Sequence, residues 1–321
     1  MRRNSVKIRK TASRNTINFS LEKVTKNTQK TLNYLNANAF PLIMAAVILD
    51  TDIGYDADDM YALLLMLNSD ETSLDLVITG DEVDGKRAQF TKKVLDMCGK
   101  PNITVIQGED LGNKDFVIDE LLGYGRYDLS TDYLTATKEL LDQNQEVIYI
   151  NIQGCSNLAK ILEAIPEAKH KMKIYQMGGS IDGFAEHNFK LDPVAADYVL
   201  RSGADIKLVM AQTTFNPVLQ IHNKHRIYQR LKASHNEVHQ MLARHTELFN
   251  ERKKLFPYMH DPLTVAEAMG KEFIKYFQSA AGVDDIGRTF LYETGPKLDL
   301  SYRKSKANEF MRFLEKRLFS D

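Results

Sequence analysis

The sequence predicts an α/β fold, in which a single domain is built on a mostly parallel, Rossmann-like mixed sheet flanked by helices. From residue 45 onward, short β-branched runs alternate with longer runs whose apolar residues have helical spacing. This alternation is typical of parallel sheets that are covered by helices on both faces. With 321 residues, of which 43% are hydrophobic and 26% charged, the chain can bury a sizeable hydrophobic core without cross-links such as disulfides.

The first predicted strand, residues 47–49, is followed by a predicted helix over 59–67, and the same order repeats along the chain. Further strands are expected at 76–79, 103–106, 146–150, 173–177 and 206–210, and further helices at 88–97, 157–165 and 194–201. Beyond about residue 220 the strand pattern stops, so we expect a helical C-terminal part. It comprises a polar helical region over 222–256, a helix opened by Pro262 and a last helix near 305–319.

The first 45 residues differ in charge from the rest. Residues 1–45 hold nine Lys and Arg but only one acidic residue, a net charge of +8, so the remaining 33 basic and 42 acidic residues give 46–321 a net charge of −9. The basic part is poor in large apolar residues and cannot build a core of its own. We expect residues 1–45 to be a surface extension of the domain 46–321; a disordered tail, a tether to nucleic acid or a membrane surface, and a targeting segment are alternatives.

Composition also narrows the class of protein. Two cysteines, Cys98 and Cys155, are too few for a disulfide framework, which favours a reducing compartment and a cytoplasmic location. No apolar run reaches the length of a membrane span, so we expect no transmembrane segment. Because the predicted domain is acidic, nucleic acid is not an expected partner of it.

An acidic segment directly follows the first predicted strand. Residues 50–59 read DTDIGYDADD and carry five carboxylates, and no Lys or Arg occurs between Lys30 and Lys86, a stretch that holds eleven Asp and Glu. In open α/β sheets the ligand crevice lies at the carboxyl ends of the strands. Crowded carboxylates repel one another unless a cation is bound, and many oxygen ligands favour Ca²⁺. Any single aspartate could instead cap a helix or line a turn.

Two other aspartate motifs could also account for this segment. An EF-hand loop counted from Asp50 would need Gly and Glu at the positions of Tyr55 and Tyr61, so this motif is excluded. An aspartate-nucleophile phosphatase also places Asp-x-Asp after a strand, but it expects Thr or Val where Gly54 stands. We keep such a phosphatase as a minor alternative.

Four segments, taken together and in this order, resemble the inosine–uridine preferring nucleoside hydrolase family. They are residues 50–59, residues 154–158 (GCSNL), residues 177–196 (with MGG, AEHN and DPVAA) and residues 260–262 (HDP). The resemblance spans roughly residues 46–280. It implies a nucleoside hydrolase fold, hydrolysis of the N-glycosidic bond of ribonucleosides by a Ca²⁺-bound water, a role in purine and pyrimidine salvage, and a homo-dimer or tetramer.

The resemblance also implies roles for individual residues. Asp52 would bind Ca²⁺ and take the proton from the attacking water, and His260 would give a proton to the leaving base. Asp50 joins the expected ligands because it faces the same way as Asp52 along the strand. Fixed carboxylates suit a sugar that develops positive charge, and a histidine can act as an acid near neutral pH. The full set of expected Ca²⁺ ligands is Asp50, Asp52, Asp59, Asp261 and the backbone carbonyl of Gln153; the expected substrate-binding residues are Asp56, Asp58, Asp81, Met177, Glu186, His187 and Asn188.

Three departures from the family pattern leave the substrate open. Gln153 stands where Thr is usual, His187 replaces a common Phe, and Asp81 follows Gly80 where the family often has Asn. Either Asp56 or Asp58 would hold the ribose hydroxyls. The substrate could be a common nucleoside or another riboside, and a catalytically silent Ca²⁺- or ribose-binding interaction protein is the second hypothesis.

Overall fold

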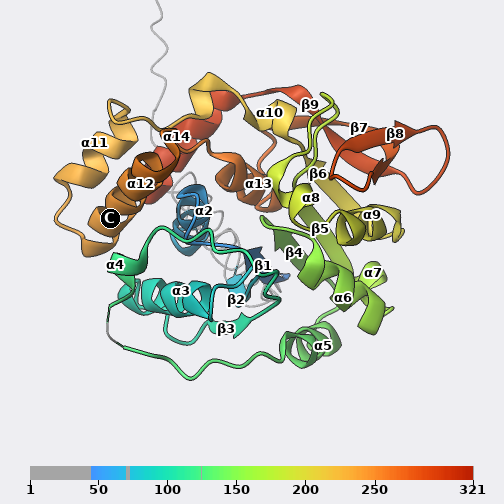
Figure 1. Ribbon diagram of the computed structural model, residues 1–321, viewed down its shortest axis with the longest axis horizontal. Helices are drawn as coiled ribbons and strands as arrows, with labels where there is room; N and C mark the ends of the chain where they lie inside the picture. Colours follow the sequence, from blue (N-terminus) through green and yellow to red (C-terminus); the bar gives the residue numbers. More distant parts are fainter. Residues whose placement is uncertain (1–44, 70–72, 124, 321) are drawn as a thin grey trace, which may run out of the picture. The chain divides into compact units, whose positions relative to one another are not determined.

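The computed structural model describes residues 45–69, 73–123 and 125–320, so the expected basic extension lies outside the described residues. The described strands are β1 (Ala46–Thr51), β2 (Ser73–Thr79), β3 (Thr104–Gln107), β4 (Val147–Asn151), β5 (Met172–Met177), β6 (Asp205–Val209), β7 (Ile274–Val283), β8 (Thr289–Tyr292) and β9 (Leu298–Ser305). They form one sheet in the order β3-β2-β1-β4-β5-β6-β9-β7-β8 (Figure 1). Neighbours from β3 to β9 in this order are parallel, and β7 is antiparallel to β9 and β8. This arrangement confirms the predicted α/β fold.

Helices connect the strands and cover the sheet. The described helices are α2 (Asp58–Leu67), α3 (Lys86–Met97), α4 (Asp119–Leu122), α5 (Tyr133–Gln143), α6 (Ser156–Ala164), α7 (Ala168–Lys171), α8 (His187–Leu191), α9 (Pro193–Arg201), α10 (Ala211–Thr214), α11 (Arg226–Ala233), α12 (Glu237–Lys253), α13 (His260–Ala268) and α14 (Ala307–Leu318), with a 3₁₀ turn at Pro217–Leu219. The helices predicted after β1, β2, β4 and β5 all form close to the expected residues.

Strand β1 lies inside the sheet, between β2 and β4, and separates two hydrophobic cores. Val47 and Leu49 belong to a core completed by α2, α3, α13 and α14, whereas Ile48 belongs to a second core completed by α5, α6 and α9. Side chains alternate between the two faces of a strand, so a strand covered on both faces must be apolar at every position. Burial on both faces explains why residues 47–49 form an uninterrupted apolar run. The strand then ends near Asp50, at the side of the sheet where the carboxyl ends of the parallel strands lie.

The prediction that no strands follow residue 220 was wrong for the last part of the chain. Residues 226–268 are largely helical as expected, but β7, β8 and β9 follow and extend the sheet beyond β6. The reason lies in their burial. In β9, Leu298 and Leu300 are buried while residues 302–304 are exposed, and β7 is only partly buried over its first half. Strands that face solvent contain polar residues and lack the β-branched runs that marked the central strands.

Within residues 45–69, 73–123 and 125–320, no helix has the length and apolar character needed to cross a membrane.

Candidate active site

The acidic segment after β1 meets the starts of two helices. Residues 52–57 form a loop that leads into the first turn of α2, and α2 packs against α13. Gly54 has a φ of 117°, and a side chain there would collide with the ring of Phe116. The Gly in the sequence motif is therefore required by the close packing of this loop.

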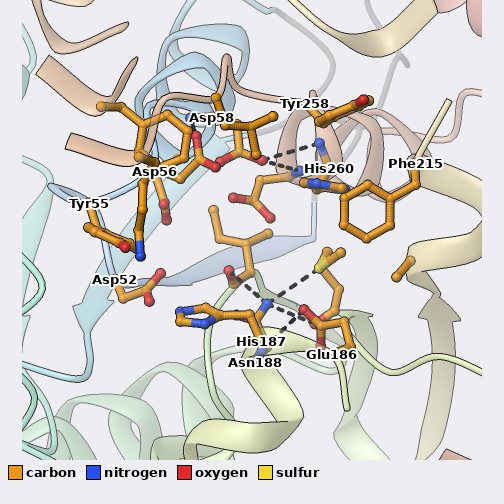
Figure 2. A pocket seen from close by; sticks show the side chains of 18 of the residues that line it. Asp52, Tyr55, Asp56, Asp58, Glu186, His187, Asn188, Phe215, Tyr258 and His260 are labelled. Carbon is orange, nitrogen blue, oxygen red and sulfur yellow. Dashed lines mark hydrogen bonds between the residues drawn. The ribbon is translucent and has the colours of Figure 1, made fainter. Parts of the chain in front are cut away.

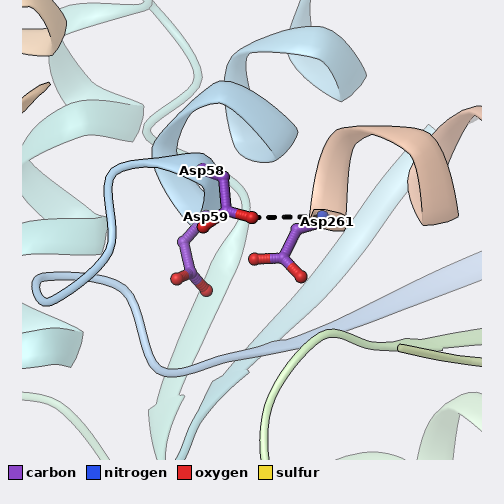
Figure 3. A group of neighbouring side chains, drawn as sticks. All are labelled: Asp58, Asp59 and Asp261. Carbon is purple, nitrogen blue, oxygen red and sulfur yellow. Dashed lines mark hydrogen bonds between the residues drawn. The ribbon is translucent and has the colours of Figure 1, made fainter. Parts of the chain in front are cut away.

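Three buried carboxylates from these helices converge. Oxygen atoms of Asp58, Asp59 and Asp261 all lie within 4.8 Å of one another, close enough to share one metal ion (Figure 3). Asp58 and Asp59 occupy the first turn of α2, and Asp261 occupies the first turn of α13. Both helix starts direct their positive dipole ends toward the carboxylates, which favours negative charge at this point.

Hydrogen bonds fix two of these carboxylates. Asp58 Oδ2 accepts hydrogen bonds from the backbone N–H groups of His260 (3.2 Å) and Asp261 (3.3 Å), so a side chain of α2 satisfies amides in the first turn of α13. The Thr51 hydroxyl, at the end of β1, donates to Asp59 Oδ1. Strand and helices thereby hold the carboxylates in one arrangement before any ligand is bound.

The electrostatics of the cluster suit the binding of a cation. Burial raises the pKa of Asp50 and of Asp56 to about 7, and raises the pKa values of Asp58, Asp59 and Asp261 well above the usual carboxyl range. Neighbouring carboxylates add to the effect of burial on Asp58, Asp59 and Asp261. All donors are hard oxygen atoms, which Ca²⁺ and Mg²⁺ prefer, so these residues fit a hard divalent cation. Such an ion would return the carboxyls to their ionised form.

The cluster forms part of the wall of a cavity of about 470 Å³, a size that suits a small ligand. Asp52 and Asp56 line the cavity together with the three clustered carboxylates. Figure 2 shows Tyr55 and Asp52 on one side of the cavity and Phe215 and His260 on the other. The cavity therefore has two chemically different ends.

His260 lies in aromatic surroundings. Its ring is 4.8 Å from the Phe215 ring in an edge-to-face arrangement and 5.7 Å from the Tyr258 ring, and its Nδ1 shares a 2.6 Å hydrogen bond with the Thr214 hydroxyl. Burial lowers the pKa of His260 to about 3, so the imidazole is neutral near pH 7. Since Thr214 engages Nδ1, Nε2 is the ring atom left for a ligand. Flat aromatic faces beside this histidine suit a planar heterocyclic base.

Glu186, His187, Asn188 and Met177 also line the cavity, and their predicted contact with substrate stays a prediction. Glu186 accepts hydrogen bonds from the N–H groups of Asn188 (3.1 Å) and Gly179 (2.9 Å), and so caps α8. The Asn188 amide donates to the Met177 carbonyl (3.2 Å) and to the Met177 sulfur (3.4 Å). These bonds fix the polar wall opposite the acidic loop.

Three predicted site residues lie elsewhere. Asp50 is fully buried outside the cavity wall, and its carboxylate accepts hydrogen bonds from Tyr149 (2.6 Å), Gln153 (2.7 Å) and Asn157 (2.9 Å). The Gln153 carbonyl accepts a 3.3 Å hydrogen bond from Gln176, which leaves one lone pair. The predicted metal-binding roles of Asp50 and Gln153 stay untested; the geometry favours Asp50 as the residue that orients the Gln153 side chain.

Asp81 is likewise not among the residues that line the cavity; it pairs with a buried arginine. Arg87 is 0% exposed, and its guanidinium lies 3.4 Å from Asp81 Oδ2. Asn113 donates to the other Asp81 oxygen at 2.7 Å. Burial raises the pKa of Asp81, while Asn113 and Arg87 oppose that rise. Both carboxylate oxygens are engaged, so the predicted contact of Asp81 with substrate stays a prediction.

Arg87 also supports the acidic loop from behind. Its guanidinium donates to the backbone carbonyls of Asp52, Ile53 (3.2 Å) and Asp115 (2.9 Å), and its Nε donates to the Asp81 carbonyl (2.7 Å). The positively charged guanidinium of Arg87 is therefore buried against the backbone of the loop that carries Asp52. Sequence reasoning missed Arg87 because its distance from residues 50–59 along the chain gave no sign of contact.

Sequence reasoning also missed the aromatic and basic residues of the cavity. Phe215, Phe249, Lys253, Leu255 and Tyr258 lie outside the four family segments, whereas Tyr55 and Phe184 lie within two of those segments at positions that the resemblance did not single out. The missed lining residues are Tyr55, Phe184, Phe215, Phe249, Lys253, Leu255 and Tyr258.

Replacing Arg87 by Met should lower the free energy of unfolding by roughly 3–5 kcal/mol, because Asp81 and several buried carbonyls lose their partner. Lys86→Met is the matched control: Lys86 makes an ion pair with Asp119 at the surface, and its loss should change stability by less than about 1 kcal/mol. Urea unfolding measures both. An Arg87→Met protein as stable as the Lys86→Met protein would show that the buried contacts are not needed.

Metal-free protein should lose stability as the pH rises from 6.5 to 8. Carboxyls of Asp56, Asp58, Asp59 and Asp261 have raised pKa values in the folded state, whereas in the unfolded chain they ionise near pH 4, so the folded state holds more protons in this window. Above pH 6.5 the buried imidazole of His260 is neutral in the folded state and mostly neutral in the unfolded chain. Thermal unfolding in a chelator should therefore give a lower melting temperature at pH 8. A constant or rising melting temperature would contradict these electrostatics.

The comparisons with known proteins agree with this geometry. The family model described as inosine-uridine preferring nucleoside hydrolase matches residues 47–312. A pyrimidine-specific ribonucleoside hydrolase RihA of Salmonella schwarzengrund is 26% identical over 270 residues, which cover 75% of this chain and 85% of the relative.

Solved structures show the same fold. The plant nucleoside hydrolase PpNRh1 matches with a TM-score of 0.72 and 21% identity, over 86% of this chain and 99% of that one. A purine-preferring ribonucleoside hydrolase from Gardnerella vaginalis matches with a TM-score of 0.71 and 20% identity, over 85% and 98%. The family match covers most of the chain, the resemblance seen in the sequence is confirmed, and the phosphatase alternative is set aside. The chain belongs to the inosine-uridine preferring nucleoside hydrolase family and is an N-ribosyl hydrolase.

Proposed function

We propose that the protein uses Ca²⁺ to hydrolyse the N-glycosidic bond of ribonucleosides, releasing the base and ribose. The observation that carries this proposal is the meeting of buried carboxylates from α2 and α13 in the wall of a cavity that also holds His260 among aromatic rings. Asp52, Asp59, Asp261 and the Gln153 carbonyl would hold the ion, and Asp58 lies close enough to Asp59 and Asp261 to be a further ligand. When bound, Ca²⁺ would supply a water molecule that loses a proton more easily than bulk water.

Residues of this chain would carry the remaining steps. Asp52 lines the cavity and would accept the proton of the attacking water. As the bond to the base breaks, positive charge develops on the ribose, and the fixed carboxylates would stabilise it. Asp56 or Asp58 would hold the ribose hydroxyls on one side, with Glu186 and Asn188 on the other.

His260 would assist departure of the base. A neutral imidazole with Nδ1 held by Thr214 presents Nε2 to the base, where it would donate a hydrogen bond as negative charge builds up on the leaving group. Phe215 and Tyr258 would stack on the base and keep water away from it. A protonated imidazole is not needed for this role.

Base preference does not follow from the relatives. RihA is named pyrimidine-specific, whereas the Gardnerella vaginalis enzyme is named purine-preferring. Stacking faces accept either kind of base, so we propose the ribonucleoside class without a preferred base. We further propose a role in nucleoside salvage, a cytoplasmic location and a homo-dimer or tetramer, as the family resemblance implies. The basic character of residues 1–45 leaves a targeting role for that segment as an alternative.

Asp52→Asn should abolish turnover while the protein stays folded. Loss of a general base lowers kcat by roughly a thousandfold, and the amide keeps the size of the side chain. Free ribose should be measured from purine, pyrimidine and nicotinamide ribosides, with and without a Ca²⁺ chelator. Wild-type release should stop in chelator and return with added Ca²⁺.

Asp285→Asn, an exposed change that is not part of the cavity wall, is the matched control and should behave as wild type. Undiminished ribose release by Asp52→Asn would contradict the role of Asp52. No release from any riboside, despite binding of Ca²⁺, would favour the catalytically silent binding protein instead.

A further inference from the structure

The end of the cavity opposite His260 has its own chemistry. Tyr55, from the acidic loop, packs with His187 at a ring separation of 6.3 Å and with Phe249 at 5.8 Å. The Lys253 ammonium, at the end of α12, lies 4.6 Å from the centre of the Tyr55 ring. Tyr55, His187 and Lys253 all line the cavity, and Figure 2 shows the first two away from Phe215.

The Tyr55 hydroxyl lacks a partner at this end. The residue is 8% exposed, and its hydroxyl is buried without a hydrogen bond to any group of the described residues. A buried hydroxyl without a partner is costly, and native structures rarely leave one unless a ligand or water completes it. Because Tyr55 lines the cavity, a bound molecule could provide the missing acceptor.

Lys253 is unusual among the lining residues. Six carboxylates line the cavity, and Lys253 is the one Lys or Arg in that lining. Its interaction within the described part of the chain is with the Tyr55 ring, and it forms no ion pair there. The end of α12 also favours a cation through the helix dipole, but exposed Arg252 occupies the same turn without lining the cavity. The helix end alone does not explain why one ammonium is directed to the cavity.

Ribose geometry connects this end to a particular atom of the substrate. In a β-ribonucleoside the base on C1′ and the CH₂OH group on C4′ lie on the same face of the sugar, but they are attached on opposite sides of the ring oxygen and extend in different directions along the ring. With the base beside Phe215 and His260, as in the proposed function, the 5′ carbon points toward Tyr55 and Lys253. A neutral 5′ hydroxyl can accept a hydrogen bond from an ammonium, but only a 5′ phosphate also balances its charge.

We propose that this end of the cavity is a phosphate subsite, formed by Lys253, the Tyr55 hydroxyl and His187, and that the preferred substrates are ribosides with a phosphate on the 5′ carbon. The inference rests on the proposed function. The reaction is hydrolysis: water adds to C1′, the C1′–N bond breaks, the base leaves with one proton, and ribose 5-phosphate is the other product. A phosphate makes charge-assisted hydrogen bonds with an ammonium and a phenol.

The test compares phosphorylated and unphosphorylated forms of the same sugar. Inosine and uridine are compared with their 5′-monophosphates as substrates, and ribose with ribose 5-phosphate in direct calorimetric binding. Wild type should favour the phosphorylated form at least roughly tenfold in kcat/KM and in affinity, which is the effect of one charge-assisted contact. Lys253→Met should remove most of this preference, and Arg252→Met, the matched control, should keep it.

Tyr55→Phe supplies a second variant that spares the fold, because the hydroxyl that it removes makes no hydrogen bond in the described structure. It should weaken ribose 5-phosphate binding several-fold at an unchanged or higher melting temperature, because the hydroxyl that it removes is buried without a partner. Cleavage of the nucleosides in preference to their 5′-phosphates, with no effect of Lys253→Met, would overturn the subsite and leave the proposed function intact. Binding of ribose 5-phosphate that depends on Lys253, without hydrolysis of any riboside, would support the subsite and overturn the proposed function.

Discussion

Repulsion among buried carboxylates is the constraint on which the site depends. Asp58, Asp59 and Asp261 are brought within 4.8 Å of one another by two helices that start at the same place. Two helix dipoles, the Thr51 hydroxyl and the α13 amides reduce this repulsion without removing it, since the pKa values of all three carboxyls stay well above their usual range. Protonation relieves the repulsion when no ion is bound, and a cation could take the place of those protons.

Charge balance extends beyond the cavity. Arg87 places a guanidinium beneath the acidic loop, pairs with Asp81 and holds the Asp52 carbonyl. Lys253 places an ammonium at the opposite, exposed side. The buried cation supports the loop permanently, whereas the exposed one is free to meet a ligand. Because Arg87 is buried and Lys253 is exposed, we assign a structural role to Arg87 and a substrate-binding role to Lys253.

Much of the fold followed from local patterns, because central parallel strands are apolar at every position and helices keep one apolar face. Strands β7 to β9 were missed because their solvent-facing side is polar, and the buried alternation in β9 is too short to be distinctive. Asp52, Asp59, Asp261 and His260, which line the cavity, were singled out by motifs that follow the end of β1 and open α2 and α13. Arg87, Tyr258 and Lys253 were not, because they reach the site only through tertiary packing, which local sequence does not encode.

The most direct test of this account is calorimetric titration of Ca²⁺ into metal-free protein at pH 7, in two buffers that differ in ionisation enthalpy. Because the clustered carboxyls hold protons when no ion is bound, the account predicts saturable binding accompanied by net release of protons, and therefore a binding heat that differs between the buffers. Absence of binding, or binding with the same heat in both buffers, would contradict the claim that crowded, protonated carboxyls form the cation site.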